Sequence, residues 1–228
     1  MRISLRKLLV TAALGLSPLV AGVMFPGHAM AYPKPSLYPI SWELKFAHAA
    51  PKRIVVITPG TANPVAYWYM TYTVTNLTDK EQQFLPVFEM MTDSGKVIRS
   101  DDQKAIPSAV FDAIKKREKN RALEPIEKIG GRVLIGEDQA RDGVAIWIEP
   151  THRMGTFHIF AGGLSGETTF LKDGEEVAAK DVNALSIADR KKLVTLHKSL
   201  EMTYQIAGDE IKPEEDAVLS KGEEWLMR

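Results

Sequence analysis

A strict alternation of side-chain type constrains the fold of this chain more than any other feature. The residues from Val65 to Thr75 read V-A-Y-W-Y-M-T-Y-T-V-T. In a β-strand, successive side chains point to opposite faces of the sheet. Aromatic and β-branched residues also suit a pleated strand better than a helix. The pattern therefore predicts a strand with a core-facing side and an opposite side of tyrosines and threonines. The core-facing side carries Trp68, Met70, Tyr72 and Val74.

The same period of two recurs along the chain, and turn residues separate the alternating runs. Many short strands with few helices between them indicate an antiparallel β-sandwich rather than a parallel α/β sheet. A long last strand is expected to place Leu200, Met202, Tyr204 and Ile206 in the core. The expected strands cover residues 41–46, 53–58, 65–75, 81–91 with a kink or bulge at Pro86, 97–99, 133–135, 144–148, 156–161, 168–171 and 195–206.

Helical insertions are predicted near residues 107–120 and 181–193. Ser108 is expected to cap the first helix, whose cationic residues cluster toward its C-terminal end. Ser186 and Asp189 have the spacing of a capping box for the second. The charged stretch from residue 208 to 220 is expected to be loose, with Trp225 and Leu226 attaching the end of the chain to the core.

The first 31 residues have the pattern of an export signal. Three basic residues near the start precede an apolar run from Leu8 to Phe25, and Ala29-Met30-Ala31 resembles a signal-peptidase site. An uncleaved anchor is the alternative, but glycine and proline interrupt the apolar run. We therefore expect a signal peptide over residues 1–31 and one domain over residues 32–228, working in the periplasm or secreted. No later stretch is long and apolar enough to predict a transmembrane segment.

The cysteine count and the charge balance limit how the chain is stabilised and which classes of partner are expected. The chain has no cysteine, so its stability must come from packing rather than disulfides. It has 29 basic and 29 acidic residues, and the leader carries three of the basic ones, so the remainder is slightly acidic. That balance gives no electrostatic reason to expect nucleic acid as a partner. A protein or an envelope polymer is the expected partner.

Two segments resemble immunoglobulin-like modules of secreted bacterial proteins. Residues 69–80, Y-M-T-Y-T-V-T-N-L-T-D-K, resemble the second strand and following corner of such modules. Residues 135–138, I-G-E-D, followed by Val144-Ala145-Ile146-Trp147, resemble a later corner and strand. The resemblance implies an immunoglobulin-like β-sandwich and an extracytoplasmic location. It brings no catalytic residues with it.

The candidate binding site is the strand face that carries Tyr67 and Tyr69. If this face is exposed, it forms a flat aromatic patch suited to a glycan or a protein, because aromatic side chains give large contact area at little entropic cost. The alternative is that the first helix or an insertion covers the face.

A candidate metal site is His152-Arg153-Met154, because imidazole and thioether ligands together suit copper. The alternative is that the methionines pack in the core. The segment G-G-L-S-G at 162–166 fails as a nucleophile elbow, because Gly166 follows Ser165 directly. A turn between strands is expected there.

No catalytic constellation and no cofactor motif is recognisable. The sequence therefore predicts a non-catalytic extracytoplasmic β-sandwich that binds or positions another macromolecule. A carbohydrate-binding module is the first alternative, and a periplasmic copper-handling protein is the second.

Overall fold

The computed structural model describes residues 32–58, 63–102, 106–207 and 217–228. These residues belong to one compact unit. The unit is mainly β, with antiparallel sheets and few helices, as the alternation predicts. The expected signal peptide lies outside the described residues, as does residue range 208–216 of the expected loose stretch.

The first sheet is built around β3, whose bounds, Val65–Thr75, match the predicted strand. The strand β9 (Arg141–Ile148) runs antiparallel to it, with Trp68 opposite Trp147. On its other side, β1 pairs with the end of β3 and β2 with its beginning. The short β7 lies parallel to β9 at the far edge. The three smaller strands are β1 (Lys45–His48), β2 (Lys52–Val56) and β7 (Glu124–Pro125).

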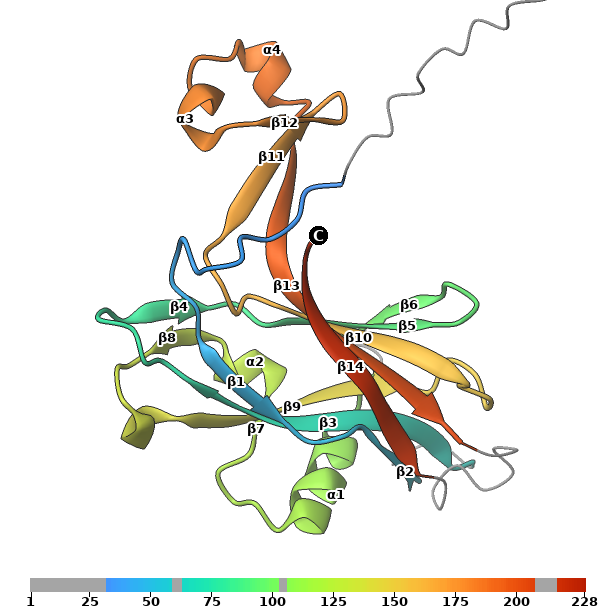
Figure 1. Cartoon of the computed structure of the whole chain (residues 1–228). Helices are drawn as coiled ribbons and strands as arrows, with labels where there is room; N and C mark the ends of the chain where they lie inside the picture. Colours follow the sequence, from blue (N-terminus) through green and yellow to red (C-terminus); the bar gives the residue numbers. More distant parts are fainter. Residues whose placement is uncertain (1–31, 59–62, 103–105, 208–216) are drawn as a thin grey trace, which may run out of the picture. The chain divides into compact units, whose positions relative to one another are not determined.

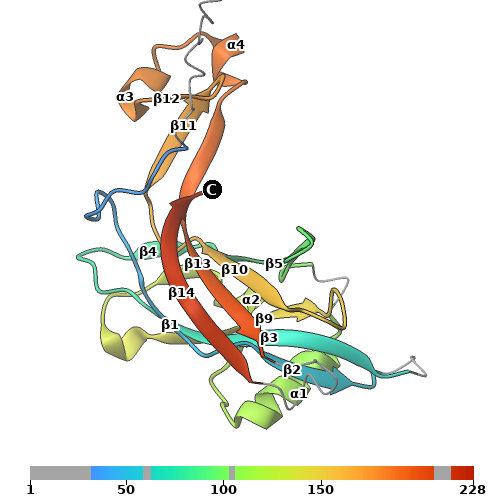
Figure 2. The ribbon, with the colours of Figure 1, turned by 45° about the vertical axis from the view of Figure 1, so that its right-hand side comes forward.

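The second, seven-stranded sheet is built around β13 (Val194–Ile206). One side of β13 pairs with β11 near its beginning and with β10 further along, and its other side pairs with β14. Figures 1 and 2 show β11 and β12 extending away from the remaining strands with two short helices. The other strands of this sheet are β5 (Val87–Thr92), β6 (Val97–Arg99), β10 (Thr156–Gly162), β11 (Thr168–Lys172), β12 (Glu175–Val177) and β14 (Val218–Met227).

The main core lies between the inner faces of these two sheets. The side chains predicted to face it from β3 and β13 are all buried in it, and Phe88, Phe157 and Ile159 join them from β5 and β10. A separate two-stranded sheet of β4 (Gln82–Phe84) and β8 (Gly131–Val133) closes one end, and Phe84 and Val133 reach the same core. The single kinked strand predicted over residues 81–91 is instead two strands, β4 and β5, which lie in different sheets on either side of Pro86.

The first helix, α1 (Ser108–Glu118), lies where the sequence predicts it. Ser108 is its first residue rather than its cap; Pro107 holds the cap position and makes no side-chain hydrogen bond. Ser186 caps α4 as predicted, accepting a hydrogen bond from the Asp189 amide. The remaining helical turns are α2 (Ile126–Ile129), the 3₁₀ turn η1 (Glu137–Gln139), α3 (Ala179–Val182) and α4 (Ile187–Arg190).

The prediction of a loose stretch through residue 220 is wrong for its last three residues, because they belong to the strand β14. Residues 218–220 begin this strand, which pairs along β13 through Met227 (Figure 2). The register shifts between Thr203 and Tyr204, opposite Gly222, whose φ of 134° suits glycine. Trp225 packs against the main core, so the end of the chain is attached there as predicted.

Candidate functional site

The tyrosine face of β3 is buried, so it offers no exposed aromatic patch. Tyr67 is 2% exposed and Tyr69 is 0% exposed. They belong to a second apolar cluster, in which Val110 and Ile114 of α1 cover the outer side of the first sheet. The physical reason is the apolar stripe of α1, which removes this face from water. The alternative that a helix covers Tyr67 and Tyr69 is therefore the one that the structure has.

The end of α1 is fixed to this face by a polar contact. The Tyr69 hydroxyl donates to Glu118 Oε1 at 2.6 Å, and Lys52 Nζ donates to Glu118 Oε2 at 2.9 Å. Burial and the adjacent carboxylate raise the pKa of Tyr69 well above its usual value. Burial acts to raise the pKa of Glu118, but hydrogen bonds from Tyr69 and Lys52 outweigh it and leave that pKa lowered. These contacts hold α1 against the sheet, so the Tyr67 and Tyr69 side chains contribute to packing and are not open to a ligand.

His152 and Met154 lie in different environments. The His152 side chain is 64% exposed, with Nδ1 3.6 Å from Glu149 Oε1. Met154 is buried in the main core. Met90 and Met202 are core residues too, and His158 Nδ1 is 2.7 Å from Glu201 Oε1. Among the described residues no group of three or more histidine or acidic side chains is placed to hold a metal ion. The structure does not assemble the predicted copper ligands.

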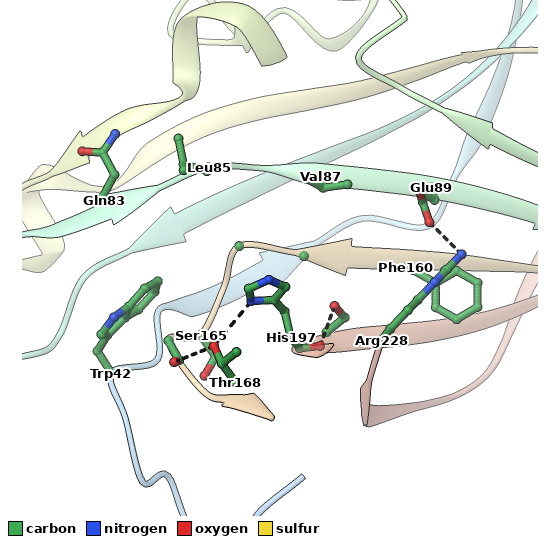
Figure 3. A pocket seen from close by; sticks show the side chains of 14 residues that line it. Trp42, Gln83, Leu85, Val87, Glu89, Phe160, Ser165, Thr168, His197 and Arg228 are labelled. Atoms are coloured by element: carbon green, nitrogen blue, oxygen red, sulfur yellow. Dashed lines mark hydrogen bonds and ion pairs between the residues drawn. The ribbon is translucent and has the colours of Figure 1, made fainter. Parts of the chain in front are cut away.

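A cavity of about 590 Å³ lies on the outer side of the seven-stranded sheet (Figure 3). The period of two identifies the side. On β5, Phe88 and Met90 face the core, so Val87 and Glu89 point outward; on β10, Phe160 lies between two core residues. The lining residues are Trp42, Gln83, Leu85, Val87, Glu89, Phe160, Gly162, Gly163, Ser165, Gly166, Thr168, His197, Ser199 and Arg228.

One wall of the cavity is a paired arginine. The Arg228 guanidinium lies 3.9 Å from the centroid of the Phe160 ring, and its Nη2 is 2.7 Å from Glu89 Oε2. Arg228 and His197 exchange two backbone hydrogen bonds, of 2.7 and 2.9 Å, which hold Arg228 beside β13. Figure 3 shows the Arg228 side chain reaching across the Phe160 ring toward Glu89. The charges of the two charged side chains that line the cavity therefore offset each other, while Arg228 Nη1 is buried without a hydrogen-bond partner and Glu89 Oε1 also lies 4.0 Å from Arg99 Nη1.

The hydroxyl groups of the lining also have partners within the protein. Ser165 Oγ accepts a hydrogen bond from the Glu167 amide at 3.1 Å. Thr168 donates to the Gly166 carbonyl, and Ser199 donates to the His197 carbonyl. The His197 Nδ1 atom is 3.4 Å from Thr168 Oγ1. In the described part of the chain, no carboxylate contacts the imidazole of His197, so this pair lacks the group that orients a catalytic base.

The opposite wall is the indole of Trp42, whose backbone runs beside residues 164–166. The Gly166 amide donates to the Trp42 carbonyl at 3.0 Å, and Leu44 donates to the Leu164 carbonyl at 2.8 Å. Only glycine fits at position 166, because a Cβ there would collide with the Trp42 indole. Trp42 also packs against the main core. The backbone of Trp42 is therefore anchored beside the cavity.

A buried lysine ties the Trp42 segment to β13. Lys198 is 4% exposed, and its Nζ is 2.8 Å from Glu43 Oε2 and 3.5 Å from Glu167 Oε2. The same ammonium lies 4.8 Å from the centroid of the Trp225 ring. Glu167 Oε1 in turn accepts the Ser36 amide at 2.7 Å. This cluster fixes both Ser36 and Glu43, on either side of a surface loop.

Sequence reasoning missed the cavity, although one signal for it is present. The segment 162–166, which the sequence predicts to be a turn, lines the cavity, and its three glycines carry no side chains into the space. Gly163 has a φ of 82°, and a Cβ there would collide with the Leu85 carbonyl. Three glycines directly after an alternating strand indicate close approach of other segments. The other lining residues are far apart in the sequence, so no motif connects them.

No protein-family model, no curated protein and no solved structure matches this chain. Within the described ranges, none of the helices has both the length and the apolar character needed to cross a bilayer.

Proposed function

We propose that this chain is a non-catalytic extracytoplasmic protein that binds another macromolecule, and that an uncharged apolar group of that partner sits in the cavity on the outer side of the seven-stranded sheet. The observation that carries the proposal is the cavity itself. The solvent side of an antiparallel sheet is ordinarily polar. Here Trp42, Leu85 and Val87 surround a space of about 590 Å³, within the ordinary size range of ligand sites.

The electrostatics of the lining favour an uncharged occupant. Glu89 Oε2 and Arg228 Nη2 are paired at 2.7 Å, so the two charges offset each other, and Arg228 Nη1 is left as a buried donor that a neutral acceptor on the occupant can satisfy. A charged ligand would lose its hydration without gaining an uncompensated counter-charge, because Glu89 already offsets the charge of Arg228, and this loss is costly. The lining hydroxyls of Ser165, Thr168 and Ser199 already have protein partners. An apolar ligand therefore leaves none of these groups unsatisfied, and it removes the exposed Leu85 side chain from water.

The immunoglobulin-like assignment and the export of the chain belong to the same proposal. Two antiparallel sheets with a shared core support the first. The leader pattern of residues 1–31 supports the second. We expect N-terminal sequencing of the protein, expressed in full and recovered from its native envelope, to begin at Tyr32. A purified protein that still begins at Met1 contradicts cleavage after Ala31.

The cavity is tested with two fluorescent probes that share a naphthylamine core and differ in charge. We expect the uncharged N-phenyl-1-naphthylamine to bind the dilute protein, at submicromolar concentration, more tightly than the anionic 8-anilinonaphthalene-1-sulfonate. Val87→Trp should fill the space above Gly162, its partner across the strands, and weaken binding of the neutral probe by about tenfold or more.

Val55→Trp is the matched control, because Val55 is an exposed valine on β2 of the other sheet. It should leave binding of the neutral probe unchanged. Equal binding by the two tryptophan variants, or preference for the sulfonate, contradicts the proposed site.

A further inference from the structure

A loop of this chain presents the kind of group that the cavity accepts. Leu37 is 95% exposed and Tyr38 is 82% exposed, and Ile40 also stands in solvent. Large apolar side chains gathered on a surface commonly mark an interaction site. From Pro35 to Trp42 the sequence P-S-L-Y-P-I-S-W carries no charged side chain. We refer to residues 37–41 as the apolar loop.

Both ends of the apolar loop are held by hydrogen bonds and an ion pair, which restricts the positions that its exposed side chains can take. On one side, the Ser36 amide donates to Glu167 Oε1 at 2.7 Å. On the other, the Trp42 carbonyl accepts from Gly166 at 3.0 Å, and Glu43 is paired with Lys198. Pro39 restricts the backbone between these points. A loop ordered before binding loses less conformational entropy when it docks.

We infer that the partner of the cavity is a second copy of this chain, whose apolar loop inserts Leu37 and Tyr38 between Trp42 and Val87. This inference rests on the proposed function, because it names the partner of the same cavity. Its support is the complementarity of two features on one chain. The cavity has an apolar lining with paired charges, and the apolar loop offers uncharged side chains that otherwise face water.

The position of the loop makes the exchange reciprocal. The apolar loop ends at Trp42, which is itself a wall of the cavity. Leu37 and Trp42 are five residue steps apart, a reach of at most about 18 Å in an extended chain. Two copies related by a two-fold axis beside the cavity mouth can therefore each place a loop in the other's cavity. Such an isologous contact closes on itself and gives a dimer rather than a fibre.

Disulfide trapping tests this contact directly, because the natural chain has no cysteine to interfere. The Tyr38→Cys and Gln83→Cys chains are expressed in full, purified after natural processing, mixed at high micromolar concentration and oxidised. Gln83 lines the cavity at an exposed position. We expect a covalent heterodimer of these two chains. Lys116→Cys, at an exposed position on α1, is the control and should give no adduct with Tyr38→Cys.

Sedimentation and probe binding separate this inference from the proposed function. We expect the natural protein to sediment as a dimer at high micromolar concentration. The triple variant Leu37→Ser, Tyr38→Ser, Ile40→Ser should be monomeric and keep its thermal stability, because these side chains are exposed. In the natural protein, the fraction of cavities that bind neutral N-phenyl-1-naphthylamine should fall as the protein concentration rises, whereas the triple variant should not show this fall.

A natural protein that is monomeric, or a triple variant that remains dimeric, overturns the inference. If the monomer still binds the neutral probe in a way that Val87→Trp abolishes, the proposed function stands and only the second copy is excluded. If the monomeric triple variant binds no neutral probe, the proposed function fails as well.

Discussion

The hydroxyl of Tyr69 donates to the carboxylate of Glu118 at 2.6 Å, joining the middle of β3 to the last residue of α1. This contact explains how an aromatic strand face became part of a core. The helix covers the tyrosine rings, and the acceptor at its end satisfies the phenol that burial would otherwise leave without a partner. Two predictions follow from this pair, one for each residue.

Glu118→Gln should reduce the pH dependence of stability. The pKa of Glu118 is lowered in the folded protein, so the carboxylate contributes stability that is present above its unfolded pKa. That contribution is lost as the pH falls through the folded pKa. We therefore expect the variant to be less stable than the natural protein at neutral pH, with the difference vanishing in acid. Urea unfolding at a series of pH values measures this, and exposed Glu127→Gln is the control.

Tyr69→Phe should lower the free energy of unfolding by about 2 kcal/mol at neutral pH, the usual worth of a hydrogen bond to a charged group. The ring remains, so the packing under α1 is retained. Tyr38→Phe, which removes a hydroxyl from an exposed ring, should change the stability of the dilute protein little. Equal losses in the two variants would show that the contact with Glu118 contributes nothing.

Lys198→Met should be strongly destabilising, because Glu43 and Glu167 lose the cation that pairs with them. Removing one partner of a buried ion pair commonly costs about 3–5 kcal/mol. We also expect the tryptophan emission to shift to the red as the Trp42 segment loosens, measured on a Trp225→Phe background in which the other two tryptophans, Trp68 and Trp147, are buried in the core. Lys116→Met, at an exposed lysine, should unfold like the natural protein. A stable Lys198→Met variant with unchanged fluorescence rules out this role.

Gly143→Ala should disturb the contact between β9 and the main core. A Cβ at this position would collide with the Tyr72 ring and the Ile129 side chain. Overpacking of this kind typically costs about 1–3 kcal/mol. At Gly162 a Cβ would meet its nearest neighbours at 3.6 Å, which is ordinary contact, so Gly162→Ala is the matched control. Thermal unfolding should separate the two variants, and similar midpoints contradict the packing argument.

The sequence predicts the strands of the core well because their faces differ sharply in character. The bounds of β3 and β6 match the prediction, and the inward residues of β13 are the four that alternation selects. The strand β14 escaped prediction because it is largely exposed and its charged residues follow no apolar alternation. Its pairing with β13, rather than its own pattern, makes it a strand.

Whether the predicted binding and metal sites exist depends on tertiary contacts, and the alternation of side chains along a strand carries no information about those contacts. The period of two shows that Tyr67 and Tyr69 share a face, but not that α1 covers it. Proximity in the sequence placed His152 beside Met154, whereas the fold places one in solvent and the other in the core. The strand order of the second sheet brings Val87, Phe160 and Arg228 to one place, and backbone hydrogen bonds to residues 164–166 hold Trp42 beside them.

The cavity can be completed only late in synthesis, because its lining residues are spread from Trp42 to Arg228. Trp42 leaves the ribosome early and Arg228 almost two hundred residues later. Until that last arginine reaches Phe160, the pocket lacks one side, however well the earlier strands have paired. A partly made chain can thus be folded in its interior while this pocket is still open on one side, and removal of Arg228 from the folded protein would open that side again.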